Sequence, residues 1–178
     1  MRTGAWCISV KLLTIGFTKK SAEDFFELLR TSGTKRVVDV RLNNVSQLAG
    51  FAKRQDLAYF LETICGIEYV HQPLLAPTQE MLDEFRKAGT GWDRYEQRFI
   101  ELMRERRIED IIDPKLIADG CLLCSEEKPH HCHRRIVAEY LKQHWGEVEI
   151  EHLEGRGKLS TDASVNPVSN TRLARIIV

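Results

Sequence analysis

The stretch CLLCSEEKPHHCHRRIVAEYL, residues 121–141, carries the strongest fold signal in the chain. Its first four residues form a short apolar run, which is typical of a strand buried on both faces of a sheet. A polar loop follows, and apolar residues then recur at helical spacing from Ile136 to Leu141. Because parallel sheets are built from strands that lead through a loop into a helix, this stretch predicts an α/β fold.

The same order of strand and helix patterns extends over most of the chain. Short apolar or β-branched runs predict strands at residues 11–16, 36–40, 67–70, 121–124 and 148–153. Segments with helical spacing lie between them, most clearly around Trp92 and Tyr95, which are expected to face the core. We therefore predict one domain over residues 1–154, with a mostly parallel sheet of about five strands and helices on both faces, layered as in Rossmann-like and rhodanese-like folds. Residues 155–178, rich in Ser, Thr and Asn, are expected to form an extended C-terminal tail.

Composition limits the classes of function. The chain has 178 residues, 43% hydrophobic and 29% charged, as expected of a folded domain with a full core. Lys and Arg number 26 and so do Asp and Glu, so the total charge gives no argument for nucleic-acid binding, although a local basic patch would not show in it. No apolar run approaches the roughly 20 residues of a membrane helix, and no signal-peptide pattern is present, so we expect a cytoplasmic protein without a membrane partner. The five cysteines are then expected to be reduced thiols.

Two polar clusters follow predicted strands. One contains Asp39 and Arg41, and the other is the loop after Cys124. Ligands of parallel sheets bind beyond the carboxyl ends of the strands, so we expect both clusters to meet at one rim of the sheet. The hypothesis of a single site requires Arg41 and Glu126 to share a cavity.

The loop after Cys124 allows a metal site. Cys121, Cys124, Cys132 and His133 supply four ligands of the kind that zinc prefers. Side chains three apart in a strand point to opposite faces, however, which argues against Cys121 and Cys124 sharing an ion. We expect no cofactor, with zinc as the alternative.

The same loop also allows thiol chemistry. Cys124 ends a strand, as the nucleophile does in tyrosine phosphatases and rhodaneses, although the nearest downstream arginine, Arg134, lies farther along the chain than in those enzymes. Cys132 is predicted near a helix start beside His133 and Arg134, where cations favour a thiolate.

A third interpretation is a site for an anion or a polar substrate. Backbone N–H groups at the helix start would hold a phosphate or carboxylate together with Arg134 and His133. Glu126 would act as an acid or a base if burial raises its pKa. The alternative is that these charged residues only form a solvated cap of the helix.

Asp39 lies inside an apolar strand, and burying an unpaired carboxylate is costly, so it needs a partner. Arg41 would form a structural salt bridge with it or point to substrate. Lys53 adds positive charge on the same connection, and Ser46 adds a hydrogen-bonding hydroxyl. Tyr69 leaves the third predicted strand, where it would stack on a base or a ring.

Several of these segments resemble the DUF488 family, small α/β proteins without a defined function. The matching segments are TIGFTKKSAEDFFELL (14–29), VVDVRLNNVS (37–46), FAKRQDLAYFL (51–61), residues 66–103 and, with the most specific motif, LLCSEEKPHHCHRRIVAEYL (122–141). The resemblance implies that the family motifs include Asp39, Arg41, Ser46, Lys53, Cys124, Glu126, Pro129, Cys132, His133 and Arg134. Asn44 stands where the family often has proline, and Cys121 is not part of the motif, which weakens the zinc alternative. The resemblance implies no reaction.

The leading functional hypothesis is an enzyme that acts on a nucleotide-like or nucleic-acid substrate, as a hydrolase or a glycosylase-like enzyme in DNA repair or base processing. Arg41 and Arg134 would hold phosphate, and Glu126 or Asp39 would activate water or protonate a leaving group. His133 would orient one of these carboxylates. The alternatives are a non-catalytic module that binds a nucleotide or nucleic acid, and a redox or sulfur-transfer protein that uses Cys124 or Cys132.

Overall fold

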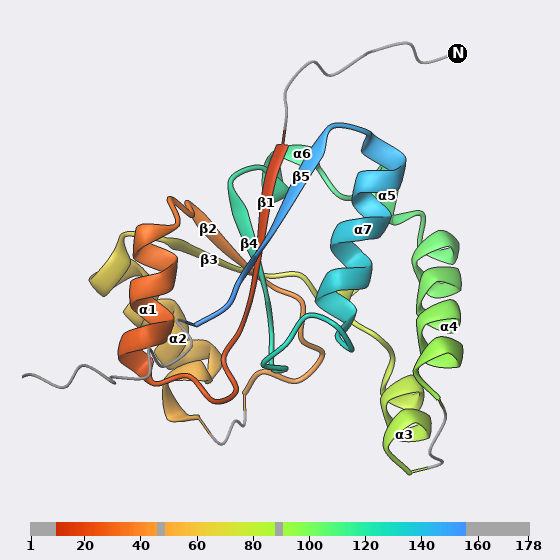
Figure 1. Cartoon of the computed structure of the whole chain (residues 1–178), viewed down its shortest axis with the longest axis horizontal. Helices are drawn as coiled ribbons and strands as arrows, with labels where there is room; N and C mark the ends of the chain where they lie inside the picture. Colours follow the sequence, from red (N-terminus) through yellow and green to blue (C-terminus); the bar gives the residue numbers. More distant parts are fainter. Residues whose placement is uncertain (1–9, 46–48, 88–90, 156–178) are drawn as a thin grey trace, which may run out of the picture.

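The computed structural model describes residues 10–45, 49–87 and 91–155 (Figure 1). Its centre is one sheet of five parallel strands in the order β3-β2-β4-β1-β5. The strands are β1 (Val10–Gly16), β2 (Arg36–Asp39), β3 (Glu68–His71), β4 (Gly120–Cys124) and β5 (Val148–Leu153). The predicted α/β fold with a parallel sheet is confirmed, and the strands lie within a residue or two of the expected ranges.

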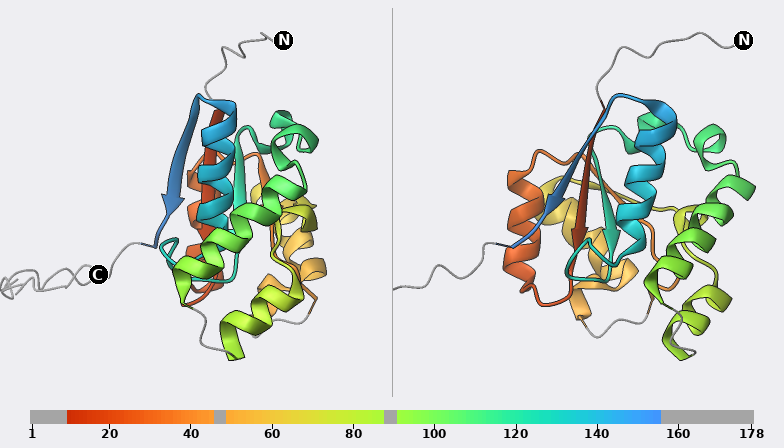
Figure 2. Two further views of the ribbon diagram at one scale, coloured as in Figure 1. Left: turned by 90° about the vertical axis from the view of Figure 1, so that its right-hand side faces the viewer. Right: turned by 45° about the vertical axis from the view of Figure 1, so that its right-hand side comes forward.

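Helices cover both faces of the sheet. The α-helices are α1 (Ala22–Thr31), α2 (Arg54–Phe60), α3 (Gln79–Lys87), α4 (Trp92–Glu105), α5 (Ile108–Ile111), α6 (Pro114–Ile117) and α7 (His133–Trp145). Shorter helical turns are η1 (Gly50–Ala52), η2 (Leu61–Cys65) and η3 (Pro73–Leu75). Helices α1 and α2 pack on one face, while α4 and α7 lie side by side on the other (Figure 2). None of the described helices is long and apolar enough to cross a membrane.

Strand β4 is buried on both faces, as its sequence predicts. All five of its residues are buried. Leu122 packs into the core beneath α4 and α7, whereas Cys121 and Leu123 pack into the core beneath α1 and α2. The alternation along the strand therefore separates Cys121 from Cys124, which ends the strand on the side of Leu122.

At the end of β4, the connections of neighbouring strands run to opposite faces of the sheet. Strand β4 lies between β2 and β1 and leads into α7 on one face. Strands β1 and β2 lead into α1 and α2 on the other face. Neighbouring connections thus diverge on both sides of β4, and ligands of parallel sheets bind in the crevice that such a divergence leaves. Cys124 occupies this position.

Candidate functional site

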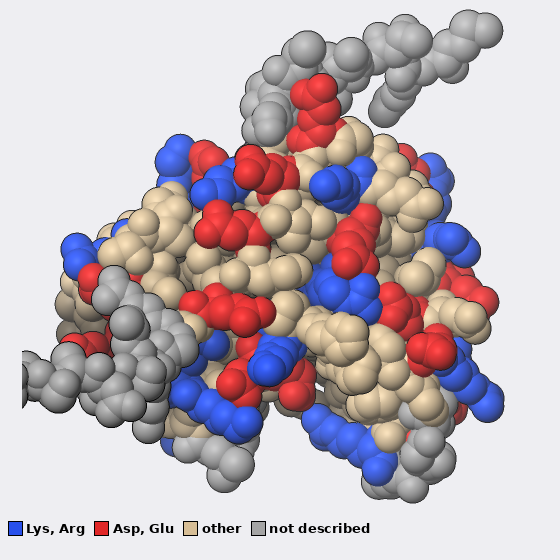
Figure 3. Space-filling model, viewed as in Figure 1, with Lys and Arg blue, Asp and Glu red and all other residues tan. Residues whose placement is uncertain are grey.

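A cleft of about 270 Å³ opens beyond the carboxyl ends of β2 and β4. The lower edge of the molecule, where the strands end, is hollowed in Figure 3 and carries both acidic and basic side chains. The cleft is lined by Arg41, Leu42, Asn43, Pro77, Leu82, Phe85, Arg86, Trp92, Tyr95, Cys124, Ser125, Glu126, His131 and His133. Arg41 and Glu126 therefore share one cavity, as the single-site hypothesis requires.

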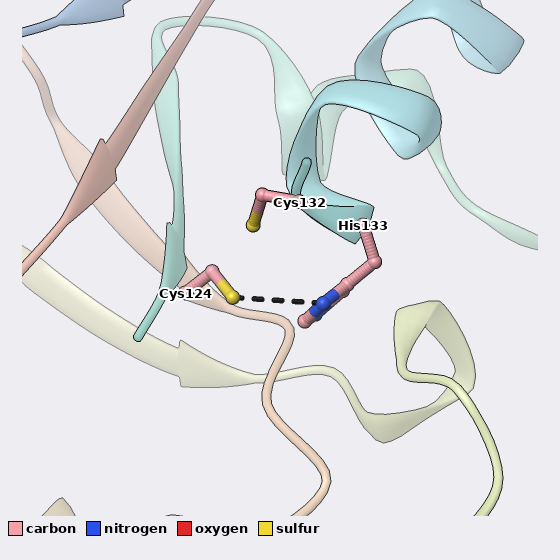
Figure 4. A group of neighbouring side chains, drawn as sticks. All are labelled: Cys124, Cys132 and His133. Atoms are coloured by element: carbon pink, nitrogen blue, oxygen red, sulfur yellow. Dashed lines mark hydrogen bonds between the residues drawn. The ribbon is translucent and has the colours of Figure 1, made fainter. Parts of the chain in front are cut away.

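Cys124, Cys132 and His133 form a compact group at this cleft, the thiol site (Figure 4). Their sulfur and ring nitrogen atoms lie within 4.8 Å of one another. Cys124 Sγ is 3.5 Å from His133 Nδ1, and the opposite ring nitrogen, Nε2, is 2.9 Å from the Val40 carbonyl oxygen. Because a carbonyl oxygen only accepts hydrogen bonds, Nε2 carries a proton and Nδ1 is left to exchange one with Cys124.

The surroundings favour a negative charge on Cys124. Burial alone would raise the pKa of this thiol, but hydrogen bonding from Cys132 and the charge and hydrogen bond of His133 outweigh burial and hold its pKa well below the usual value. The Cys132 thiol has a raised pKa, first because it is buried and then because Cys124 takes the charge. Burial would lower the pKa of His133, yet the neighbouring Cys124 raises it. Both shifts favour a negative charge on Cys124 and a positive charge on His133.

Arg134 lies beneath the cysteine loop, residues 125–131. Its guanidinium donates to the carbonyl oxygens of Glu126 at 2.6 Å and Glu127 at 3.1 Å, and to Cys132 Sγ at 3.2 Å. The side chain is 1% exposed, and no carboxylate among the described residues forms an ion pair with it. Because a buried cation without a counter-charge is costly, the adjacent pair of thiols is the natural place for the compensating negative charge.

Gly16, the last residue of β1, gives the cysteine loop its path. A methyl group at this position would overlap the Glu126 carbonyl oxygen and lie 3.0 Å from a guanidinium nitrogen of Arg134. The Thr18 backbone N–H also donates to the Ser125 carbonyl oxygen at 3.1 Å. The end of β1 therefore supports the loop from below and leaves room for the buried arginine.

Asp39 and Arg41 form a buried structural pair. The Arg41 guanidinium donates to the Asp39 carboxylate through Nε at 2.8 Å and Nη2 at 2.6 Å, and Nη1 reaches the Ala52 carbonyl oxygen at 3.0 Å. Tyr69 and Asn44 also donate to Asp39, at 2.6 and 3.2 Å. Burial would raise the pKa of Asp39, but the hydrogen bond and charge of Arg41 outweigh it and lower that pKa. This arrangement is the salt bridge that the sequence allowed as one alternative, and it holds the segment after β2.

Most of the remaining predicted site residues do not line the cleft. Asp39, Tyr69 and Arg134 are engaged in structural hydrogen bonds and do not line the cleft. Lys53 is exposed at the start of α2, also away from the cleft, and Ser46 lies outside the described residues. Glu126 lies at the cleft but is exposed, so it lacks the burial that its proposed acid role required.

The proposed set of four zinc ligands does not converge. Cys121 packs beneath α1 and α2, on the opposite face of the sheet from the thiol site. Cys124, Cys132 and His133 remain as three possible ligands, one fewer than a structural zinc site uses.

Aromatic side chains form a wall of the cleft that the sequence pattern did not assign to a site. Phe85 comes from α3, and Trp92 and Tyr95 come from the first turns of α4. The Trp92 ring also lies 5.0 Å from that of His131 in the cysteine loop. Helical spacing correctly predicted that Trp92 and Tyr95 pack inward, but it could not show that the packed cluster borders a cavity.

Fold and site together define the class: a parallel α/β protein with a cysteine–histidine pair where its central strand ends. The chain belongs to the family described as "Domain of unknown function DUF488", which matches residues 21–141. This range contains the thiol site, the cysteine loop and the Asp39–Arg41 pair. Comparison with curated proteins and with solved structures gave no match.

Proposed function

We propose that this protein is an enzyme that uses Cys124 as a nucleophile on a substrate bound in the cleft. The observation that carries the proposal is the orientation of His133. Its Nε2–H is fixed by the Val40 carbonyl oxygen, and its Nδ1 therefore faces Cys124 Sγ at 3.5 Å. A nucleophile beside a base that is oriented by a third group is the recurring arrangement of covalent catalysis.

The roles of the three groups follow from this geometry. His133 holds the proton that Cys124 gives up, so that the thiolate attacks an electrophilic atom of the substrate. The imidazolium then returns the proton to the departing group, which leaves the histidine neutral and the substrate fragment bonded to sulfur. Arg134 is a positioning residue, because it shapes the cysteine loop through two carbonyl oxygens and stabilises negative charge near the sulfur atoms.

The cleft supports a small substrate with a planar part. Its volume of about 270 Å³ is near the lower limit for ligand pockets. Phe85, Trp92 and Tyr95 offer ring surfaces, and Arg86 lies exposed at the rim. A nucleotide-like substrate has both a planar base and an anionic group, so these side chains support the nucleotide or nucleic-acid substrate expected from sequence, which stays a prediction.

The carboxylate mechanism expected from sequence is supported less well. Asp39 is fully buried and already accepts hydrogen bonds from Arg41, Tyr69 and Asn44. Glu126 is the carboxylate that reaches the cleft, where it could assist proton transfer to a bound substrate. Replacing Glu126 by Gln should therefore slow turnover less than replacing Cys124 by Ala.

The pH dependence of alkylation tests the proposal. Purified protein is treated with iodoacetamide between pH 4 and 9, and the rate at each cysteine is followed by peptide mass mapping. We expect Cys124 to react with a midpoint well below the roughly 8.5 of a free thiol. His133→Gln should move this midpoint upward, whereas His130→Gln, a change at an exposed histidine of the cysteine loop, should not. A Cys124 that reacts like a free thiol, or not at all, contradicts the proposal.

The substrate is then sought with the same variants. The protein is screened against nucleotides, modified bases and single- and double-stranded oligonucleotides. Turnover by the wild-type protein that is absent from Cys124→Ala, with binding retained, would identify the reaction. Turnover that survives this change would assign the chemistry to another residue.

A further inference from the structure

We propose that Cys132 is the resolving thiol of Cys124, so that the site reduces a hydroperoxide by two electrons and closes a Cys124–Cys132 disulfide. This inference rests on the proposed nucleophilic role of Cys124 and adds a substrate class to it. The geometric basis is that both sulfur atoms lie within 4.8 Å of each other and of the His133 ring (Figure 4).

The two thiols differ in access in the way that such a pair requires. Cys124 lines the cleft, where a substrate can reach it. Both thiols are buried, Cys124 at 3% and Cys132 at 1% exposure, but Cys132 does not line the cleft, because it lies behind Cys124 at the start of α7. A reagent that enters the cleft therefore meets Cys124 first, and Cys132 reacts with the product formed there.

Charge transfers from one sulfur to the other during the reaction. Before it, the negative charge of Cys124 keeps Cys132 protonated, which is one cause of the raised pKa of Cys132. Oxidation makes Cys124 neutral and removes this cause, while the Arg134 guanidinium stays 3.2 Å from Cys132 Sγ and favours its thiolate. Oxidation of Cys124 therefore favours the Cys132 thiolate that the next step requires, although burial of Cys132 still opposes it.

The steps balance. The Cys124 thiolate attacks the terminal oxygen of the hydroperoxide, an S–O bond forms as the O–O bond breaks, and the alkoxide leaves with the proton held by His133. The Cys132 thiolate then attacks the Cys124 sulfur, the S–S bond forms, and the hydroxyl leaves as water with the proton that Cys132 released. Two electrons pass from the two thiols to the peroxide. A small external dithiol, which becomes a disulfide itself, returns the pair to its reduced form.

The experiment uses the full chain, reduced and freed of reductant, then exposed to one equivalent of hydrogen peroxide and quenched with N-ethylmaleimide. The wild-type protein should carry two fewer N-ethylmaleimide adducts than the reduced protein quenched without peroxide, and should show a peptide that joins Cys124 to Cys132. Cys132→Ser should instead gain one oxygen atom at Cys124, trapped with dimedone. Cys65→Ser, at a partly exposed cysteine away from the site, should behave like the wild type.

Each other outcome is informative. If dimedone traps oxidised Cys124 equally in the wild type and in Cys132→Ser, the resolving role is overturned while the nucleophilic role stands. If Cys124 is inert in both, both proposals fail. If the purified wild-type protein carries one equivalent of zinc that Cys132→Ala lacks, the thiols are metal ligands and the resolving role is again overturned. Because the wild-type disulfide is mapped directly, the test does not depend on how well the variants fold.

Discussion

Replacing Asp39 by Asn tests whether the buried pair with Arg41 holds the segment after β2. The change keeps the size of the side chain and removes its charge. In the wild-type protein the carboxylate oxygens accept five hydrogen bonds: three from Arg41, including its backbone N–H, and one each from Asn44 and Tyr69. An asparagine offers one acceptor oxygen, and its NH₂ group would face donors.

The expected magnitude follows from the burial of both partners. Asp39 is 0% and Arg41 3% exposed, so the variant leaves an uncompensated cation in the interior. Removing one partner of such a pair costs about 3–5 kcal/mol of folding free energy. At 2–4 °C per kcal/mol for a chain of this size, the melting temperature should fall by about 6–20 °C.

Urea denaturation followed by circular dichroism measures the change, with linear extrapolation of the unfolding free energy. The matched control is Asp110→Asn, which breaks the exposed ion pair with Arg107 and should have little effect. The double variant Asp39→Asn with Arg41→Met removes both charges and should be more stable than the sum of the single changes predicts. A single variant as stable as the wild type would refute the reasoning, and so would strict additivity in the double variant.

Three further results are expected. Gly16→Ala should displace the cysteine loop, destabilise the protein by about 1–3 kcal/mol and slow alkylation at the thiol site, because the added methyl group overlaps a carbonyl oxygen of the loop. The control is Gly50→Ala, where the structure leaves open space for the methyl group. Equal effects of the two changes would contradict the proposed role of Gly16. Arg134→Met should raise the pH midpoint of Cys124 alkylation, since it removes the buried cation beside the two sulfurs, and an unchanged midpoint would exclude that role. The pKa of Asp39 is lower in the folded than in the unfolded protein. The ionised Asp39 therefore stabilises the fold above its unfolded pKa of about 3.9, and this stabilisation is lost as the pH falls through the lower folded pKa. The difference in unfolding free energy between the wild type and Asp39→Asn, measured in urea, should therefore narrow only in acid.

Local patterns were sufficient to predict the sheet and the general position of the cleft. The apolar run before Cys124 predicts a strand with both faces covered, and β4 is such a strand. The need of a buried carboxylate for a partner correctly indicated Arg41 as that partner of Asp39. Alternation along the strand also predicted that Cys121 would point away from Cys124, which the packing confirms.

The direction of Arg134 could not be read from the sequence. A cation in the first turn of a helix is ordinarily solvated, and the sequence pattern suggested an exposed phosphate ligand. Its burial depends on the space above Gly16, a residue of a different strand far away in the chain. The contact between His133 and Val40 is equally non-local, because the two residues are 93 positions apart in the sequence. Such contacts are set by tertiary packing, so they cannot be predicted from the pattern of residues at neighbouring positions in the sequence.

The buried arginine also explains why the cysteine loop does not surround an anion with backbone N–H groups, as the short loop between Cys and Arg does in tyrosine phosphatases and rhodaneses. Such a loop needs backbone N–H groups that point inward, but two carbonyl oxygens of this loop point at the Arg134 guanidinium. The donors that remain near the Cys124 sulfur are the Glu126 N–H, the Cys132 thiol and the His133 ring. Two of these three can themselves give up a proton. This arrangement supports the proposed thiol reaction, in which one proton and one negative charge move between neighbouring atoms, better than it supports a fixed phosphate site.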